Sequence, residues 1–327
     1  MRSPGLQLAA AFVAGTLLLG GAVSCSSDAG SDTGPTTSRA DATSTTAPST
    51  TSTSPPPASA AVLDAACDAT LVATPSAPIV EPLLTEASGV APTTGRTWIN
   101  NDSGDRPRLY GLAADGSVQV VDVTGAMAQD WEDLAVVSGG DDPHLWIADT
   151  GDNAKQRKTV VLYRVPIPAE GETSVAAQAV TVTYPDGAHD VEAAFADPDG
   201  DAVYLLTKFE YPSKVFRVDG PAGGGVAEAV AVGTFPAGRD GKGVVTGAAI
   251  SADRRAIAVR TYDASWLYPL ADGQDPAQAL AQADPARCQA PAGAEGQGEA
   301  IGFLADGSGY VTIGEGTNAV ITTIRPR

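Results

Sequence analysis

The chain has 327 residues and a formal net charge of −19 at pH 7. This excess of negative charge argues against nucleic acid or an anionic membrane surface as the main partner, whereas a cation or a basic protein fits it. Negative charge also keeps an exported protein soluble, and this simpler explanation is an alternative to a cationic or basic partner. The three Cys and two His are too widely dispersed to form a zinc site.

The start of the chain resembles an export signal. Arg2 precedes an uncharged apolar run over 6–21, which is too short for a comfortable membrane span. Ala22-Val23-Ser24-Cys25 then resembles the lipobox of bacterial lipoproteins, although Ala22 stands where Leu is usual. We predict a lipoprotein signal peptide over 1–24, a lipid on Cys25 and a position on the extracytoplasmic face of a bacterial cell membrane. An ordinary signal peptide with an incidental Cys is the alternative.

A low-complexity segment follows the signal. Residues 25–60 are almost all Ser, Thr, Ala, Pro, Gly and Asp. This composition offers too little apolar surface to offset the entropy of ordering, so we predict a disordered tether. The remaining residues, 61–327, are numerous enough for one substantial core and form the predicted folded domain.

A short pattern recurs five times in this domain. A polar residue is followed by a small or acidic residue and then by apolar residues, beginning at Ser88, Glu132, Glu192, Thr246 and Glu299. Each occurrence is followed by a turn and further short apolar runs, such as LWIAD and VYLLTK. Four short strands per repeat, with almost no helical periodicity, predict an all-β fold, a five-bladed β-propeller. A sixth blade would require extra strands within 269–291.

The ends of the domain predict how the ring closes. The fifth repeat ends before its fourth strand, so we expect 71–84 to supply that strand and to remove an open edge. Cys67 lies just before this segment, and Cys288 lies at the boundary between the fourth and fifth repeats. If Cys25 carries lipid, these two cysteines remain as a pair, and export permits their oxidation. We predict a disulfide between neighbouring blades.

The first strand of each blade lines the channel of a propeller, so the five repeat positions would form a polar ring. Glu132, Glu192 and Glu299 would repel one another there unless they were neutralised. Either Ca²⁺ or a cationic ligand group neutralises them, or Lys208 and Arg260 pair with them from the ends of second strands. The predicted ligand-binding channel comprises Ser88, Glu132, Glu192, Lys208, Arg260 and Glu299.

Two similar stretches, WINNDSGD at 98–105 and LWIADTGDN at 145–153, end abruptly in acids, glycine and amides. Asp102, Asp149 and Asp152 are the metal-ligand candidates at this rim. Side-chain bonds to the backbone of a turn explain the same residues without a metal. The Trp of each stretch is expected to pack between blades.

A His beside acids can act as a general base or a metal ligand. His189 lies three residues before Glu192, so Glu132, Glu192 and His189 are the candidate catalytic set. A structural, hydrogen-bonded His at a blade junction is the alternative. No convincing Ser nucleophile, phosphate loop or cofactor fingerprint is evident, and Ca²⁺ is the one cofactor considered.

The phrases NDSGD, DWEDLA, WIADTGDN and YPDGAHDVEA resemble a group of secreted bacterial β-propeller proteins. That group is distantly similar to calcium-dependent phytases and esterase-like propellers. The likeness covers most of 80–327 and is densest in 86–210. The resemblance implies acidic residues in the channel and bound Ca²⁺, but it does not imply that the protein catalyses a particular reaction. The cations that a phytase-like site needs for phosphate are few: Lys155, Arg157, Lys208 and Arg260.

Two functions follow from these observations. The first is a lipid-anchored, monomeric binding module whose channel rim takes a cation, a small ligand or a cell-envelope protein. The second is a calcium-assisted hydrolase, phytase-like or esterase-like, that uses the channel carboxylates. The first requires no reactive residue, and none is evident, so the sequence favours it.

Overall fold

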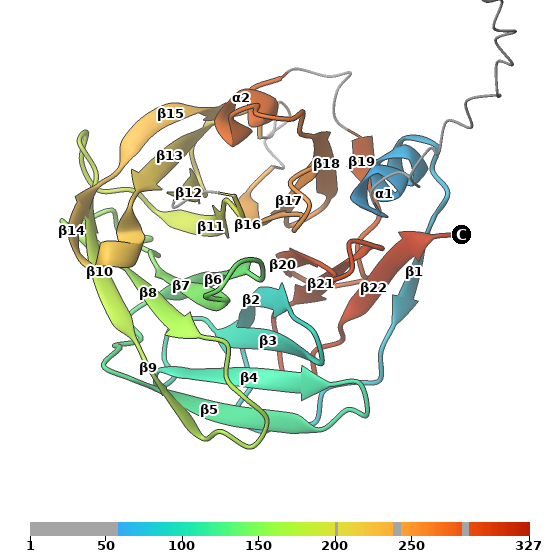
Figure 1. Cartoon of the computed structure of the whole chain (residues 1–327), viewed down its shortest axis with the longest axis horizontal. Coiled ribbons are helices and arrows are strands. Elements are labelled where there is room, and N and C mark those ends of the chain that lie inside the picture. The colour runs from blue at the N-terminus through green and yellow to red at the C-terminus, as the bar shows by residue number, and fades with distance from the viewer. Residues whose placement is uncertain (1–57, 200–201, 238–242, 283–287) are drawn as a thin grey trace, which may run out of the picture. The chain divides into compact units, whose positions relative to one another are not determined.

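The computed structural model describes residues 58–199, 202–237, 243–282 and 288–327 (Figure 1). The predicted signal peptide, the predicted lipid site Cys25 and residues 25–57 of the predicted tether lie outside this range. Within it, no helix has the length and apolar character needed to cross a membrane.

Five sheets surround one axis, each contributing its first strand to the centre (Figure 1). The inner strands are β2 (Ala87–Pro92), β6 (Trp131–Val137), β11 (Val191–Ala196), β16 (Val245–Ile250) and β20 (Gly298–Phe303). Each inner strand contacts the next around the ring, and β20 contacts β2. The prediction of a five-bladed propeller is confirmed. The described part of 269–291 holds α2 (Pro276–Leu280) and β19 (Cys288–Ala290) instead of a sixth blade.

The other strands of each blade continue outward in antiparallel order. Blade 1 has β3 (Arg96–Asn101), β4 (Arg108–Ala113) and β5 (Val118–Thr124), and blade 2 has β7 (His144–Asp149), β8 (Val160–Pro166) and β10 (Gln178–Thr183). Blade 3 has β12 (Ala202–Thr207), β13 (Ser213–Asp219) and β15 (Val230–Phe235). Blade 4 has β17 (Ala256–Thr261), β18 (Ser265–Pro269) and β19, and blade 5 has β21 (Tyr310–Gly314), β22 (Thr322–Pro326) and β1 (Leu71–Pro75).

Apolar side chains fill the spaces between neighbouring blades. Trp98 packs with Trp131 and Leu145 between blades 1 and 2, and Trp146 packs with Val191 between blades 2 and 3. The expected role of Trp98 and Trp146 is therefore confirmed. Successive side chains of a strand point to opposite faces, and strands such as β11, β12 and β17 are buried at every position, so both faces of a blade are buried against its neighbours.

The ring closes between the two ends of the domain. Strand β1 pairs antiparallel with β22 and completes blade 5, as predicted. Cys67 and Cys288 form a disulfide that links the end of α1 (Ala58–Cys67) to β19 in blade 4. The predicted disulfide between neighbouring blades is confirmed. Helix α1 was not predicted, and its first three residues fall within the segment assigned to the tether.

Segments from the following blade cover the outer edges of four blades. Strand β9 (Ser174–Ala176) pairs in parallel with β5, and β14 (Gly225–Glu228) pairs in parallel with β10. Helix α2 contacts β15, and α1 contacts β19. An uncovered edge strand exposes unpaired backbone groups to other chains, so this arrangement protects the outer rim.

Every inner strand carries a β-bulge at the same place. The strand register shifts between Ala87 and Val90 in blade 1, and across positions 131–133, 191–193, 245–247 and 298–300 in the others. The recurring polar residue lies inside the bulge in all five blades. A bulge interrupts the hydrogen-bonded ladder and changes the direction of a side chain. The repeat in the sequence therefore marks the position at which each blade redirects one polar side chain.

Candidate functional site

Polar residues gather at the end of the channel where the inner strands begin and the second strands end. We call this end the acidic mouth and define it by five carboxylic residues, Asp102, Asp130, Glu132, Glu192 and Glu299. Asp102 follows β3, and Asp130 precedes β6. The three glutamates lie in the bulges of β6, β11 and β20.

Three of these carboxylates are close together. One oxygen each from Asp102, Asp130 and Glu132 lies within 4.8 Å of the other two. Glu132 is 2% exposed, and the Ser88 hydroxyl lies 3.5 Å from its Oε2, at the outer limit of a hydrogen bond. A Cβ at Gly151 would overlap with Glu132 Oε1 and Asp130 Oδ2. A glycine is therefore required for the chain to pass this close to the two acids.

Burial and the charges of neighbouring acids raise the pKa of Asp130, Glu132 and Glu299. Burial, followed by the charge of Asp102, raises the pKa of Asp130 to about 6. Burial and the charge of Glu192 raise the pKa of Glu132 well above its ordinary value. Burial raises the pKa of Glu299 to about 7. The mouth therefore retains protons near neutral pH, where exposed carboxyls would have lost them.

One cation lies inside this cluster. Lys208 Nζ donates to Glu192 Oε2 at 2.6 Å, which is the pairing expected for Lys208. Burial raises the pKa of Glu192 to about 8, although Lys208 opposes the shift. The rings of Phe209 and Tyr262 have their centroids 5.5 Å and 5.6 Å from Lys208 Nζ and can add cation–π attraction.

Arg260 pairs with a carboxylate that the sequence analysis did not select. Its Nη2 donates to Glu295 Oε2 at 2.7 Å, and the hydroxyl of Thr312 donates to Glu295 Oε1 at 2.7 Å. The expectation that Arg260 pairs with a member of the repeat was incomplete, because Glu295 lies in the loop before β20. No repeat or alternation marks that loop, so the sequence carried no signal for it.

The predicted metal set is divided between two places. Asp102 lies with Asp130 and Glu132, whereas Asp149 accepts the backbone N–H groups of Gln129 and Asp130 at 3.3 Å and 3.1 Å. The guanidinium of Arg157 also lies 2.9 Å from Asp149 Oδ1.

Asp152 has the same kind of role in its turn. It accepts the backbone N–H of Arg157 at 2.6 Å. The side chains of Asp149 and Asp152 therefore bond backbone in the turns, which is the alternative left open above. Asp149 also positions Asp130 by accepting its backbone N–H. Asp130 was not among the predicted site residues, although it is the first residue of the phrase DWEDLA.

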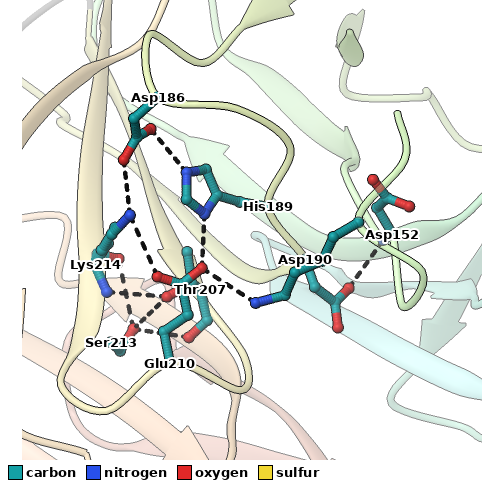
Figure 2. A network of polar contacts seen from close by, with 9 residues as sticks. Asp152, Asp186, His189, Asp190, Thr207, Glu210, Ser213 and Lys214 are labelled. Carbon is teal, nitrogen blue, oxygen red and sulfur yellow. Dashed lines mark hydrogen bonds and ion pairs between the residues drawn. The ribbon is translucent and has the colours of Figure 1, made fainter. Parts of the chain in front are cut away.

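A further carboxylate beside the cluster lacks a partner on one oxygen. Asp190 Oδ1 accepts the backbone N–H of Asp152 at 2.9 Å (Figure 2). Among the described residues Asp190 Oδ2 has no hydrogen-bond partner, and Asp190 is 1% exposed. Its charge contributes to the raised pKa of both Asp130 and Glu192. A buried oxygen of this kind is costly unless a donor or a cation satisfies it.

His189 is held between two carboxylates (Figure 2). Its Nδ1 lies 2.6 Å from Glu210 Oε1, and its Nε2 lies 2.8 Å from Asp186 Oδ1. Both ring nitrogens therefore face carboxylate oxygens of the protein. Neither nitrogen of His189 is free to contact a substrate.

Asp133 links three blades beneath the mouth. Its Oδ1 accepts the N–H of Leu134 at 2.8 Å, and its Oδ2 accepts those of Ala194 at 2.9 Å and Ala248 at 3.0 Å. Burial raises the pKa of Asp133 well above its ordinary value, although the three N–H donors oppose the shift. This role was not predicted, although Asp133 is the one acid at the second position of the repeat.

The two ends of the channel differ in chemistry. Past Asp133 the inner strands enclose an apolar cavity of about 30 Å³, lined in part by Leu134, Phe195, Ile250 and Phe303. In blade 4, Thr246 of the polar ring donates to the backbone oxygen of Gly298 at 2.9 Å. The predicted polar ring therefore lies at one mouth only, and a ligand would approach from that side.

The comparisons with known proteins identify no family. No protein-family model and no curated protein matches the chain. Among solved structures, the PQQ-bound aldose sugar dehydrogenase from Streptomyces coelicolor is similar over 79% of this chain and 99% of that chain, with a TM-score of 0.42 and 12% identity. Similarity at this level transfers neither ligand nor reaction. The resemblance to phytase-like and esterase-like propellers stays a prediction.

Proposed function

We propose that this β-propeller is a binding module that takes a hard cation, most simply Ca²⁺, at the acidic mouth. The observation that carries the proposal is the group of carboxylate oxygens from Asp102, Asp130 and Glu132 within 4.8 Å of one another. Hard divalent cations prefer such oxygen ligands. The unpartnered Oδ2 of Asp190 gives independent support, because its charge acts on the same group.

The hydrolase alternative loses its candidate base in this geometry. A calcium-assisted hydrolase built on Glu132, Glu192 and His189 needs a side chain that can accept a proton from water. Both nitrogens of His189 are engaged by carboxylates, Glu192 is paired with Lys208, and Glu132 belongs to the carboxylate group that would hold the cation. A binding role uses the carboxylates without such a base and is therefore favoured.

Calcium is expected to stabilise the protein, and to do so more at pH 8 than at pH 5.5. With a Kd of about 10⁻⁴ M, typical of extracellular modules, 5 mM Ca²⁺ contributes about 2 kcal/mol to the free energy of unfolding. This corresponds to a rise of about 4–8 °C in Tm, measured by calorimetry against an EDTA sample.

The raised pKa values of the carboxyls determine the pH dependence. Their protonation stabilises the folded state fully below about pH 4.5, and this stability is lost as the pH rises through about 6 to 8. The metal-free protein should therefore be less stable at pH 8 than at pH 5.5, and calcium should reverse the loss by replacing protons.

Glu132→Gln should abolish the calcium effect and raise the Tm of the metal-free protein at pH 8, because the neutral amide cannot ionise among the neighbouring carboxylates. The matched control is Asp141→Asn, which makes the same charge change at an exposed loop residue. An unchanged Tm at 5 mM Ca²⁺ and pH 8, or a calcium effect that survives in Glu132→Gln, would contradict the proposal.

We also propose that acylated Cys25 holds the module at the extracytoplasmic face of a bacterial cell membrane. The predicted tether of about 35 residues would span roughly 30–35 Å between the membrane and the propeller. Cys25→Ala is expected to move the protein from the membrane pellet to the soluble fraction in a host that acylates lipoproteins. Ser26→Ala, one position along, should remain in the pellet. Retention of Cys25→Ala in the pellet would refute the anchor.

A further inference from the structure

Exposed apolar side chains are concentrated on the side of the acidic mouth. Eight large hydrophobic residues are exposed in the described part of the chain. Five of them lie on loops that lead into or out of the mouth, namely Val80, Leu83, Met127, Phe209 and Tyr211. The other three, Val72, Val226 and Val230, lie on the outer strands β1, β14 and β15. The described loops of the opposite face hold none, so the two faces are not equivalent.

Two of the five are aromatic residues on one short loop between β12 and β13. Phe209 is 48% exposed and Tyr211 is 49% exposed. Between them, Glu210 accepts from His189 at 2.6 Å, and Lys214 Nζ lies 3.5 Å from its other oxygen (Figure 2). Glu210 also accepts from Lys155 at 3.3 Å. A histidine and two lysines from different segments thus fix the middle of the loop.

The two ends of the same loop are also fixed. Ser213 Oγ donates to the backbone oxygen of Thr207 at 2.7 Å, and the N–H of Lys214 donates to Thr207 Oγ1 at 2.9 Å. Lys208 is bonded to Glu192 inside the mouth. The aromatic side chains are therefore presented on a preorganised backbone, and preorganisation lowers the entropy lost on binding. Exposed aromatic residues held in this way are typical anchors of protein interfaces.

Beside this loop lie more carboxyl groups than cations. Lys208 is paired with Glu192, whereas Asp102, Asp130 and Glu132 lie together without a cation between them among the described residues. A basic side chain from a partner that covers the apolar loops would favour the ionised form of these carboxyls and pair with it.

We propose that this face is a docking surface for a protein segment that places a Lys or Arg side chain over the acidic mouth and apolar side chains on Phe209 and Tyr211. The inference goes beyond cation binding, because it assigns a partner of stated chemistry and two aromatic anchors. It does not require a metal, since the basic side chain itself supplies the positive charge.

A selection from a random 12-residue phage-displayed peptide library tests the proposal, with the full chain as bait. The selection is run in EDTA, so that its result is independent of calcium binding. The enriched peptides are expected to carry Lys or Arg next to aromatic or aliphatic residues. As synthetic peptides they should bind less tightly as the salt concentration rises from about 50 to 500 mM, because salt screens the charge pairing.

Phe209→Ser/Tyr211→Ser is expected to weaken these peptides at least about tenfold, as the loss of two interface anchors does. The matched control, Val226→Ser/Val230→Ser, removes two exposed apolar side chains from outer strands and should bind as the wild type does. Tyr211→Ser alone serves if the double variant has a lowered Tm. The proposal is overturned if no peptide is enriched, if enriched peptides lack a basic residue, or if the aromatic variants bind them unchanged.

Discussion

Asp133→Ala is expected to lower the free energy of unfolding by about 3–5 kcal/mol. The substitution leaves the N–H groups of Leu134, Ala194 and Ala248 buried without an acceptor, and each such group costs about 1–3 kcal/mol. Removal of a buried carboxylate offsets part of this cost. Because the three donors belong to blades 2, 3 and 4, the loss should spread over the inner ring.

Urea unfolding at pH 7, followed by circular dichroism, measures this change. Asp133→Asn should lose less stability than Asp133→Ala, because the amide retains one acceptor oxygen while its NH₂ group faces an N–H donor. Asp141→Ala, at an exposed position, is the control and should unfold like the wild type. A loss below about 1 kcal/mol in Asp133→Ala would mean that water or backbone movement satisfies the three donors.

Cys67→Ser/Cys288→Ser is expected to lower the free energy of unfolding by about 5 kcal/mol. The disulfide closes a loop with a sequence separation of 221 residues, and a long loop gains most from a cross-link in the chain-entropy account. The bond also ties α1, which precedes the closing strand β1, to blade 4. The release of this tie should weaken closure of the ring.

Thermal unfolding of the wild type with and without dithiothreitol checks this prediction. The reduced wild type and the double Ser variant should share one lowered Tm, since both lack the same cross-link. A reduced wild type that unfolds at the same temperature as the oxidised protein would show that β1 and β22 hold the closure without help from the disulfide.

The blade count and the ring closure could be predicted because a propeller repeats its pattern along the chain. Each inner strand has the recurring polar residue at its second position and apolar residues after it, and the fifth repeat lacks its last strand. Strands β9 and β14 were missed for the opposite reason. They have three and four residues, and their pairing depends on the edge of the neighbouring blade instead of on their own alternation.

The repeat likewise marked the residues of the candidate site, but it did not indicate which side chains each of them contacts. Ser88, Glu132, Glu192 and Glu299 are buried at the mouth as the pattern indicated. Sequence spacing says nothing about distances across blades. It therefore could not show that Asp130 lies beside Asp102 and Glu132, or that Glu295 pairs with Arg260. Nor could it show that both ring nitrogens of His189 contact carboxylates.

By itself, the sequence determined the class of fold, the number of blades, the disulfide and the polar members of the ring, because these follow from local periodicity and from the order of the chain. Only the tertiary structure decided which acids share one mouth and which are neutralised. The bulges turn side chains from five distant repeats toward one place, and the balance of burial and charge there depends on all of them together.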